Sequence, residues 1–285
     1  MPVVPFKEIL QDAFDKRYGV PAFNIVNDLT MEAVLSAAED AHSPIIIQTS
    51  VKTVKSIGID VLYAMWVEMT RHIKVPAAIH LDHCPERAMI SACLAKGWSS
   101  VLFDASAMPV EENRRQTIEV VAEAKRYGAG VEGEIEGIKG VEDGVGSDAE
   151  SERKTLEVSL DFIRATGVDC FAPAIGNAHG VYKQTPKLDA ERVTAITTVI
   201  PIPIALHGGT GLTEEQFHDL IARGCAKVNI STALKIKFMQ SNLTFLREAE
   251  AKNKWDPPSQ FSFVRKAVKE MVTEYLQQFG SAGRA

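Results

Sequence analysis

Two features of the sequence predict an α/β fold built as a closed barrel. Apolar runs and amphipathic helical patterns alternate along the whole chain. The apolar runs are continuous rather than alternating, as in parallel strands that are covered on both faces. There are eight strand–helix units, and no Gly-x-Gly-x-x-Gly turn of the doubly wound folds follows the first strand. We therefore expect a (β/α)8 TIM barrel with a long loop after strand 5 and an extra C-terminal helix.

The predicted elements follow one another in a regular order. The strands are expected at Pro21–Val26, Pro44–Gln48, Pro76–Leu81, Val101–Asp104, Gly130–Ile135, Cys170–Ala174, Pro203–Leu206 and Ala226–Ile230. The helices are expected at Pro5–Asp15, Thr30–His42, Ile59–His72, Pro85–Lys96, Pro109–Tyr127, Thr155–Thr166, Asp189–Thr198, Thr213–Arg223, Leu234–Lys252 and Phe261–Phe279. Thr213 and Gln216 have the spacing of a capping box at a helix start.

Two segments exceed a minimal barrel. Glu136–Lys154 is long, charged and rich in glycine, which predicts a mobile loop above the fifth strand. The helix Phe261–Phe279 carries an apolar stripe at helical spacing. That stripe packs on the barrel or against another subunit, and both arrangements are consistent with the sequence.

Length and charge narrow the class of protein. A barrel typically takes about 250 residues, so the 285 residues are expected to form a single domain, 1–285. The formal net charge of −6 argues against a nucleic-acid partner. No apolar run approaches the roughly 18 residues of a membrane span, and no signal-peptide core is present. The four cysteines are widely spaced and form no disulfide framework, so a reducing, cytoplasmic location is expected.

Polar residues stand at the ends of the predicted strands. Barrel enzymes build their active sites on the loops that leave the carboxyl ends of the strands. We therefore expect these side chains to converge on one rim: Asn24, Ser50, Asp82, His83, Asp104, Glu134, His179, His207 and Asn229. The remaining histidines are expected to be structural, with His80 packed inside the third strand and His42, His72 and His218 solvated on helices.

The chemistry of this rim points to a metal beside an anion site. Three imidazoles can hold a metal while one coordination position stays open for substrate. The Gly-rich turn His207–Gly211 and the turn Asn229–Thr232 can offer backbone N–H groups to a phosphate. A metal beside a phosphate indicates a phosphorylated substrate with an oxygen that the metal polarises.

These residues carry a resemblance to a known family. The motifs are His80-Leu81-Asp82-His83, Glu132-Gly133-Glu134 followed by Gly140–Gly144, Asn177-Ala178-His179-Gly180, His207-Gly208-Gly209-Thr210-Gly211 and Asn229-Ile230-Ser231-Thr232. In this order they resemble the metal-dependent class II ketose-bisphosphate aldolases over nearly the whole chain. The length is similar to that of the short form, which includes fructose- and tagatose-bisphosphate enzymes.

The resemblance implies a role for each residue. The metal, zinc or another divalent ion, would be held by His83, His179 and His207, with Asp104 and Glu134 at an alternative metal position. Asp82 would move the proton at the carbon next to the ketone, and Glu142 on the loop would be the second acid/base carboxylate. The resemblance also implies substrate-binding residues and a monovalent-cation site for Na⁺ or K⁺. The substrate-binding residues would be Asn24, Ser50, Gly180, Gly208, Gly209, Thr210, Asn229, Ser231 and Thr232.

The implied activity is reversible cleavage of a ketose 1-phosphate or 1,6-bisphosphate to dihydroxyacetone phosphate and an aldehyde, a lyase reaction of carbohydrate metabolism. A homodimer or homotetramer is expected. The chain departs from the family pattern at Glu136 and Lys139, where Gly is usual, and at Ala233, where an acid is usual. These changes leave the second substrate open. Candidates for a second phosphate are Lys52, Lys55 and Lys183.

Three alternatives remain at this level. An aldolase of the same family could act on a different phosphorylated ketose. Schiff-base chemistry needs a lysine inside a strand, but the sixth strand has none and Lys227 is expected at the start of the eighth. A non-catalytic phosphosugar-binding barrel, acting as regulator or scaffold, would leave Asp82 and Glu142 idle. Turnover by purified protein separates the last alternative from the others.

Overall fold

The computed structural model describes residues 3–142, 145–147, 153–182 and 184–285, and only the backbone of 141, 142 and 145–147. It confirms the predicted barrel. Eight parallel strands close on themselves in the order β1-β10-β9-β8-β5-β4-β3-β2. The strands are β1 (Val20–Asn24), β2 (Ile45–Ser50), β3 (Ala77–Cys84), β4 (Ser100–Phe103), β5 (Gly130–Glu134), β8 (Cys170–Ala172), β9 (Ile204–Leu206) and β10 (Cys225–Ile230).

Each helix predicted from the sequence is present within a few residues of its expected bounds. They are α1 (Phe6–Lys16), α2 (Asp28–Asp40), α4 (Ile59–Thr70), α5 (Arg87–Lys96), α6 (Val110–Arg126), α7 (Leu156–Thr166), α8 (Ala190–Val199), α9 (Glu214–Arg223), α10 (Thr232–Lys252) and α11 (Pro257–Gln278). The capping box of Thr213 and Gln216 at the start of α9 is confirmed. His42 and His72 are exposed as expected, but each lies in a turn after a helix rather than on it.

Three short elements were not predicted. The helix α3 (Val51–Ile57) begins directly after β2, and the Ser50 side chain accepts a hydrogen bond from the backbone N–H of Thr53 at its start. The loop after β5 contains an antiparallel pair, β6 (Gly140–Glu142) and β7 (Val145–Ser147). Elements of three to seven residues are too short to show a period in the sequence.

The inside of the barrel is lined by small side chains. Ala22, Ala78, Ala172, Ala205 and Ala226 are buried there. The helix α1 covers the amino-terminal end of the strands, and its Phe6 ring stacks on His80 with ring centroids 5.4 Å apart. The alanines leave room for larger polar side chains that project inward from neighbouring strands.

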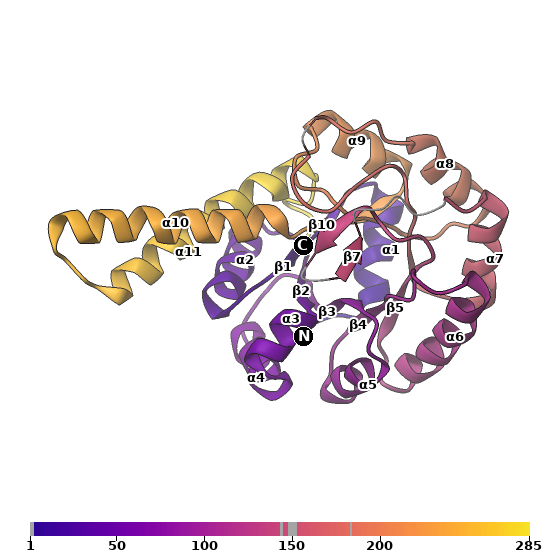
Figure 1. Cartoon of the computed structure of the whole chain (residues 1–285), viewed down its shortest axis with the longest axis horizontal. Helices are drawn as coiled ribbons and strands as arrows, with labels where there is room; N and C mark the ends of the chain where they lie inside the picture. Colours follow the sequence, from indigo (N-terminus) through magenta and orange to yellow (C-terminus); the bar gives the residue numbers. More distant parts are fainter. Residues whose placement is uncertain (1–2, 143–144, 148–152, 183) are drawn as a thin grey trace.

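The last two helices form an arm that extends from the barrel (Figure 1). The α11 stripe is buried within the same chain at Val264, Val268 and Val272, because α11 packs on α2 and α10. Arg265 pairs with Glu32, and Lys269 pairs with Asp40 at 2.7 Å, which fixes α11 on α2. Within the described residues, no helix has the length and hydrophobicity needed to span a bilayer.

Candidate active site

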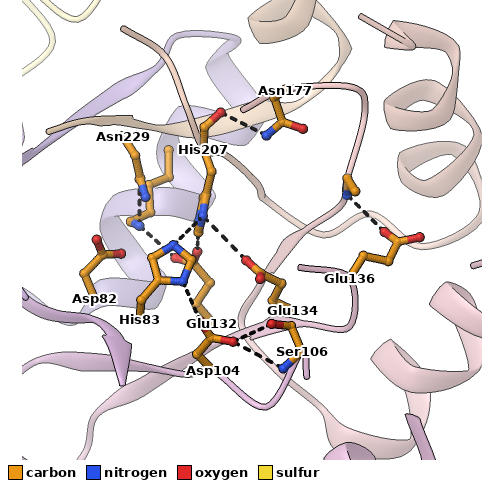
Figure 2. A network of polar contacts seen from close by, with 12 residues as sticks. Asp82, His83, Asp104, Ser106, Glu132, Glu134, Glu136, Asn177, His207 and Asn229 are labelled. Atoms are coloured by element: carbon orange, nitrogen blue, oxygen red, sulfur yellow. Dashed lines mark hydrogen bonds and ion pairs between the residues drawn. The ribbon is translucent and has the colours of Figure 1, made fainter. Parts of the chain in front are cut away.

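The structure brings the predicted polar residues together at the carboxyl end of the barrel. Figure 2 shows side chains from separate strands and turns pointing toward one another: His83, Asp104, Glu132, Glu134 and His207. Asn24, Asp82, His83, Glu134 and Asn229 lie at strand ends, whereas Asp104, His179 and His207 lie in the turns that follow β4, β8 and β9. Ser50 stands in register with Asp82, so it also lies at this rim.

Two of the histidines face each other through one nitrogen each. His83 Nδ1 lies 2.9 Å from Asp104 Oδ2, and His207 Nε2 lies 2.6 Å from Glu132 Oε1. An ionised carboxylate only accepts hydrogen bonds, so each ring donates from that nitrogen. The other nitrogens, His83 Nε2 and His207 Nδ1, are 3.0 Å apart. Two lone pairs would meet there if both rings were neutral, so the contact holds either one shared proton, which a charged His83 supplies, or a metal ion in its place.

The third imidazole completes a site that fits a divalent metal. His83, His179 and His207 offer ligand atoms that all lie within 4.8 Å of one another. Burial, and then the charge of His83, lowers the pKa of His179 to about 2, which keeps this ring neutral and able to bind a metal. Carboxylates on the outer nitrogens of metal-binding imidazoles are the usual way to fix such rings. The donor set, three imidazoles, suits zinc, which binds each ring in its neutral form.

A second group of possible ligands shares His83. Its side chain, Asp104 and Glu134 also offer atoms within 4.8 Å of one another. Burial would raise the pKa of Asp104, but the hydrogen bond and charge of His83 hold it well below its usual range. Burial and the nearby carboxylates of Asp104 and Glu132 raise the pKa of Glu134 well above its usual range, despite the charge of His83. This group matches the alternative metal position predicted from the sequence.

The backbone at the imidazoles is held in unusual conformations. His83 has a φ of 42°, in the left-handed region that non-glycine residues rarely adopt. Such conformations concentrate at functional sites. Gly208 has a φ of 67°, and a Cβ there would lie 2.2 Å from the backbone oxygen of Ala178. Glycine at 208 therefore lets the turn after β9 pass against the turn that carries His179.

Asp82 is a buried carboxylate with one uncommitted oxygen. Its Oδ2 accepts a hydrogen bond from Asn24 Nδ2 at 2.8 Å, and Gln48 in turn donates to Asn24 Oδ1 at 2.6 Å. Within the described residues, Asp82 Oδ1 has no hydrogen-bond partner. Burial alone would raise the pKa of Asp82, but the charges of His83 and Lys227 lower it to about 2. The group is therefore ionised at neutral pH and can accept a proton.

The turns after β9 and β10 form a second, polar part of the rim. The backbone N–H of Gly209 donates to the backbone oxygen of Asn229 at 3.3 Å, and Thr210 Oγ1 accepts from the backbone N–H of Ala233 at 3.1 Å. Ser231 caps α10, and its buried Oγ has no hydrogen-bond partner among the described residues. Thr232 is the first residue of α10 and is half-buried. Gly180 has a φ of 95° beside His179.

Sequence reasoning assigned no site role to several polar residues. Glu132 and Lys227 are fully buried inside the barrel and contact the site from within it. Asn177 Nδ2 donates to the backbone oxygen of His207 at 2.9 Å. The hydroxyl of Tyr182 accepts from the Ala178 N–H and donates to the Gly208 oxygen, which joins two of the loops. For Glu132 and Lys227 the signal was available, since both are charged residues within otherwise apolar strands.

The structure also describes Glu136, where the chain departs from the family pattern, and two of the lysines named as candidates for a second phosphate. Glu136 is only 1% exposed. Its carboxylate accepts from the backbone N–H groups of Lys154 and Ala174, and pairs with Arg192 at 2.7 Å. It therefore ties together the two ends of the loop after β5. Lys55 pairs with Glu86 at 2.5 Å, and Lys52 is exposed.

Two candidate residues lie outside the part of the chain that the structure describes. They are Lys183 and the side chain of Glu142. The backbone of Glu142 belongs to β6, whose first residue follows Lys139. The Lys139 backbone oxygen accepts from the His179 N–H at 2.8 Å, so β6 begins beside His179.

A closed (β/α)8 barrel with imidazoles, carboxylates and glycine-rich turns at its carboxyl rim has the architecture of a barrel enzyme. The family model described as "Fructose-bisphosphate aldolase class-II" matches residues 4–284. The chain therefore belongs to the class II fructose-bisphosphate aldolase family, and it is an aldolase.

Two curated relatives cover the whole chain and 99% of their own length. A sulfofructosephosphate aldolase of Alkalicoccus urumqiensis is 33% identical over 286 residues. A fructose-bisphosphate aldolase of Geobacillus stearothermophilus is 36% identical over 292 residues.

Two solved structures agree in fold. The YdjI aldolase from Escherichia coli K12 has a TM-score of 0.84 with 30% identity and covers 99% of both chains. A putative fructose-1,6-biphosphate aldolase from Coccidioides immitis has a TM-score of 0.88 with 30% identity and covers 97% of this chain and 96% of its own.

Proposed function

We propose that the chain is a divalent-metal-dependent aldolase that reversibly cleaves a ketose 1-phosphate or 1,6-bisphosphate. The products would be dihydroxyacetone phosphate and an aldehyde. The observation that carries the proposal is the buried Asp82, whose Oδ1 has no hydrogen-bond partner among the described residues, directly before His83 in a cluster of three imidazoles. Base and metal site thus share one strand end. Zinc is the proposed metal, and we also propose a cytoplasmic, single-domain homodimer or homotetramer.

The metal and the protein divide the chemistry. A divalent metal held by His83, His179 and His207 supplies Lewis-acid stabilisation of the negative charge that develops when the carbon–carbon bond beside a ketone breaks. Asp82 holds or moves the proton at the carbon next to the ketone, because Asn24 occupies only one of its oxygens. The dense packing of β1, β2 and β3 around Asn24, Gln48 and Asp82 keeps this carboxylate in one orientation.

The phosphate of the substrate is proposed to bind at the turns after β9 and β10. Barrels commonly bind phosphate with the loops after their seventh and eighth strands, which are β9 and β10 here. The amino-terminal end of α10 faces this position with its partial positive charge. Ser231 Oγ, which has no partner among the described residues, would supply a donor, and Gly180, Gly208, Gly209, Thr210, Asn229 and Thr232 would line the same site. A monovalent cation, Na⁺ or K⁺, is proposed beside the same turns.

Ser231→Ala tests this phosphate site. A lost hydrogen bond to a charged group is worth about 1.5–3 kcal/mol, so the variant should bind every productive ketose phosphate about 10- to 100-fold more weakly. Isothermal titration with inhibitor or substrate measures the change. Ser241→Ala, on α10 but bonded to the Lys237 oxygen, is the control. Unchanged affinity of Ser231→Ala would place the phosphate elsewhere.

Glu142→Ala tests the second carboxylate. The loop that carries Glu142 is proposed to close over the bound phosphosugar, so that this residue exchanges a proton during bond cleavage. The variant should lose most of its kcat while its affinity for the substrate changes little. Steady-state kinetics and a binding titration measure the two quantities. A ligand-bound structure with the Glu142 carboxylate far from the sugar would assign the role to another group.

The site argues against two of the alternatives. Lys227 Nζ lies 2.8 Å from Glu132 Oε2 and 2.8 Å from Asn229 Oδ1, so this lysine is held as a charged donor rather than as a Schiff-base nucleophile. In a barrel that only binds sugar, Asp82 Oδ1, which has no hydrogen-bond partner among the described residues, would have no role. An aldolase acting on another phosphorylated ketose stays open, because the names of the relatives indicate different ketose substrates.

The far end of the sugar is proposed to enter a hollow beside the His179 turn. This hollow has a volume of about 380 Å³ and is lined by Lys139, Arg153, Gly176 and Asn177 among others. Turnover of a panel of ketose phosphates by wild type and Lys139→Ala tests it. Cleavage of the panel supports the aldolase proposal, and a changed ranking of substrates supports this position for the aldehyde end. Efficient cleavage of ketoses without a 1-phosphate would contradict the proposed phosphate site.

A further inference from the structure

We propose that Lys227 is a positioning residue that holds both halves of the active site in register. It acts through Glu132 and His207 on the metal side, and through Asn229 on the substrate side. The inference rests on the proposed function for what each half binds, and it adds a residue whose side chain lies beneath the site.

Lys227 is a charged side chain enclosed by the barrel. It is 0% exposed, and it projects from β10 toward β5, where Glu132 is also 0% exposed. A buried ion pair is weak evidence for stability, because desolvation opposes the attraction of the charges. Its presence among buried alanines therefore needs another explanation. Both ends of this pair make a further contact with a residue of the rim.

On the metal side, Lys227 fixes the direction of the Glu132 carboxylate. Its Nζ lies 2.8 Å from Glu132 Oε2, so the other oxygen, Oε1, faces His207 and accepts the Nε2–H of that ring at 2.6 Å. This contact fixes the tautomer of His207, so its Nδ1 presents a lone pair toward His83. Without Lys227 the carboxylate is free to rotate, and the His207 Nε2–H loses its fixed acceptor.

On the substrate side, Lys227 fixes the direction of an amide. The Nζ group donates to Asn229 Oδ1 at 2.8 Å, and an ammonium group has no acceptor. The atom of Asn229 that faces Lys227 is therefore its oxygen. The two N–H donors of the same amide stay available for a substrate oxygen. The Lys227 ammonium group thus orients a hydrogen-bond donor, the Asn229 amide, at the end of β10. Through Glu132 it also orients a lone pair of His207 in the group of three imidazoles.

Cobalt binding to metal-free protein tests the metal half without any sugar. Co²⁺ bound to the imidazoles gives visible absorption bands, which should vanish in His179→Ala. Lys227→Met should bind Co²⁺ about 10- to 100-fold more weakly, the range seen when residues behind metal ligands are changed. Glu132→Gln acts on the same imidazole as Lys227→Met. The double variant with both changes should therefore bind Co²⁺ no more weakly than whichever single variant binds it more weakly.

Arg192→Met is the matched control for the loss of a buried cation. Arg192 pairs with the buried Glu136 at 2.7 Å, away from the imidazoles. This variant also leaves a carboxylate without its partner, but its Co²⁺ affinity should stay at the wild-type value. Should Lys227→Met fail to fold, the double variant removes both buried charges and still reports the effect. Wild-type Co²⁺ affinity in a folded Lys227→Met or double variant would overturn the inference, as would an equal loss in Arg192→Met.

Phosphate binding tests the substrate side of the inference, the contact of Lys227 with Asn229. Inorganic phosphate should bind Lys227→Met more weakly than it binds Glu132→Gln, because only the first variant frees the Asn229 amide. Equal phosphate affinity in the two variants would remove Asn229 from the inference. These titrations also distinguish it from the proposed function. A protein that binds Co²⁺ through Lys227-dependent imidazoles but cleaves no ketose would contradict the aldolase reaction and leave the positioning role standing.

Discussion

Removal of divalent metal by dialysis against a chelator is expected to abolish cleavage of the ketose phosphate, and zinc or cobalt should restore it. The loss should be complete within the limits of the assay, because the Lewis acid would be held where His83, His179 and His207 converge. Without the metal, the charge that develops beside the ketone has no Lewis acid to stabilise it. Coupled assays of the apo and reconstituted protein measure the effect.

The control for this experiment is a measurement that the metal-free protein is still folded. The barrel core is built from apolar strands and helices, so circular dichroism of the metal-free protein should match that of the reconstituted protein. Full activity in demonstrably metal-free protein would contradict the metal mechanism. Inactivation by borohydride in the presence of substrate would do the same, since it traps a Schiff base on a lysine.

Asp82→Asn is expected to lower kcat by about 10²- to 10⁴-fold, the range for general acid–base groups. The amide has nearly the shape of the carboxylate but cannot accept the proton at neutral pH. Metal content and substrate affinity should stay close to wild type, because the imidazoles and the turns after β9 and β10 are separate from the Asp82 side chain. Metal analysis, a binding titration and steady-state kinetics measure the three quantities.

Asp169→Asn is a matched control at the opposite end of the barrel. Asp169 precedes β8 and accepts a hydrogen bond from the backbone N–H of Val131 at 3.0 Å, far along the strands from the rim. This variant should keep its kcat. Near-normal turnover in a metal-replete Asp82→Asn protein would remove Asp82 from the proton-transfer step.

The barrel was predictable because each strand is a continuous apolar run followed by a helix with a clear period. The approximate site was predictable because polar residues stand where those runs end, as with Asp82 and His83 at the end of β3. Position along a strand therefore indicated which end of the barrel each group reaches. Convergence on one rim then followed from the closed parallel arrangement.

Partners across the barrel were not predictable from position along the chain. Lys227 was expected at the start of its strand, but β10 begins at Cys225, so Lys227 lies within the strand and is buried. Its partner Glu132 lies on β5, and only the closure of the sheet brings the two together. The role of Glu136 was not predictable for the same reason, because its charge is used by Arg192 and two backbone N–H groups inside the fold.

The measurement that tests the central claim most directly is a coupled assay for dihydroxyacetone phosphate across ketose mono- and bisphosphates, with metal-replete, metal-free and Asp82→Asn protein. The account predicts release from at least one ketose 1-phosphate or 1,6-bisphosphate by the metal-replete wild type. It predicts no release by the metal-free protein and a loss of about 10²- to 10⁴-fold in Asp82→Asn. Release of dihydroxyacetone phosphate by metal-free protein, or no release from any member of the panel by zinc- or cobalt-loaded wild type, would contradict it.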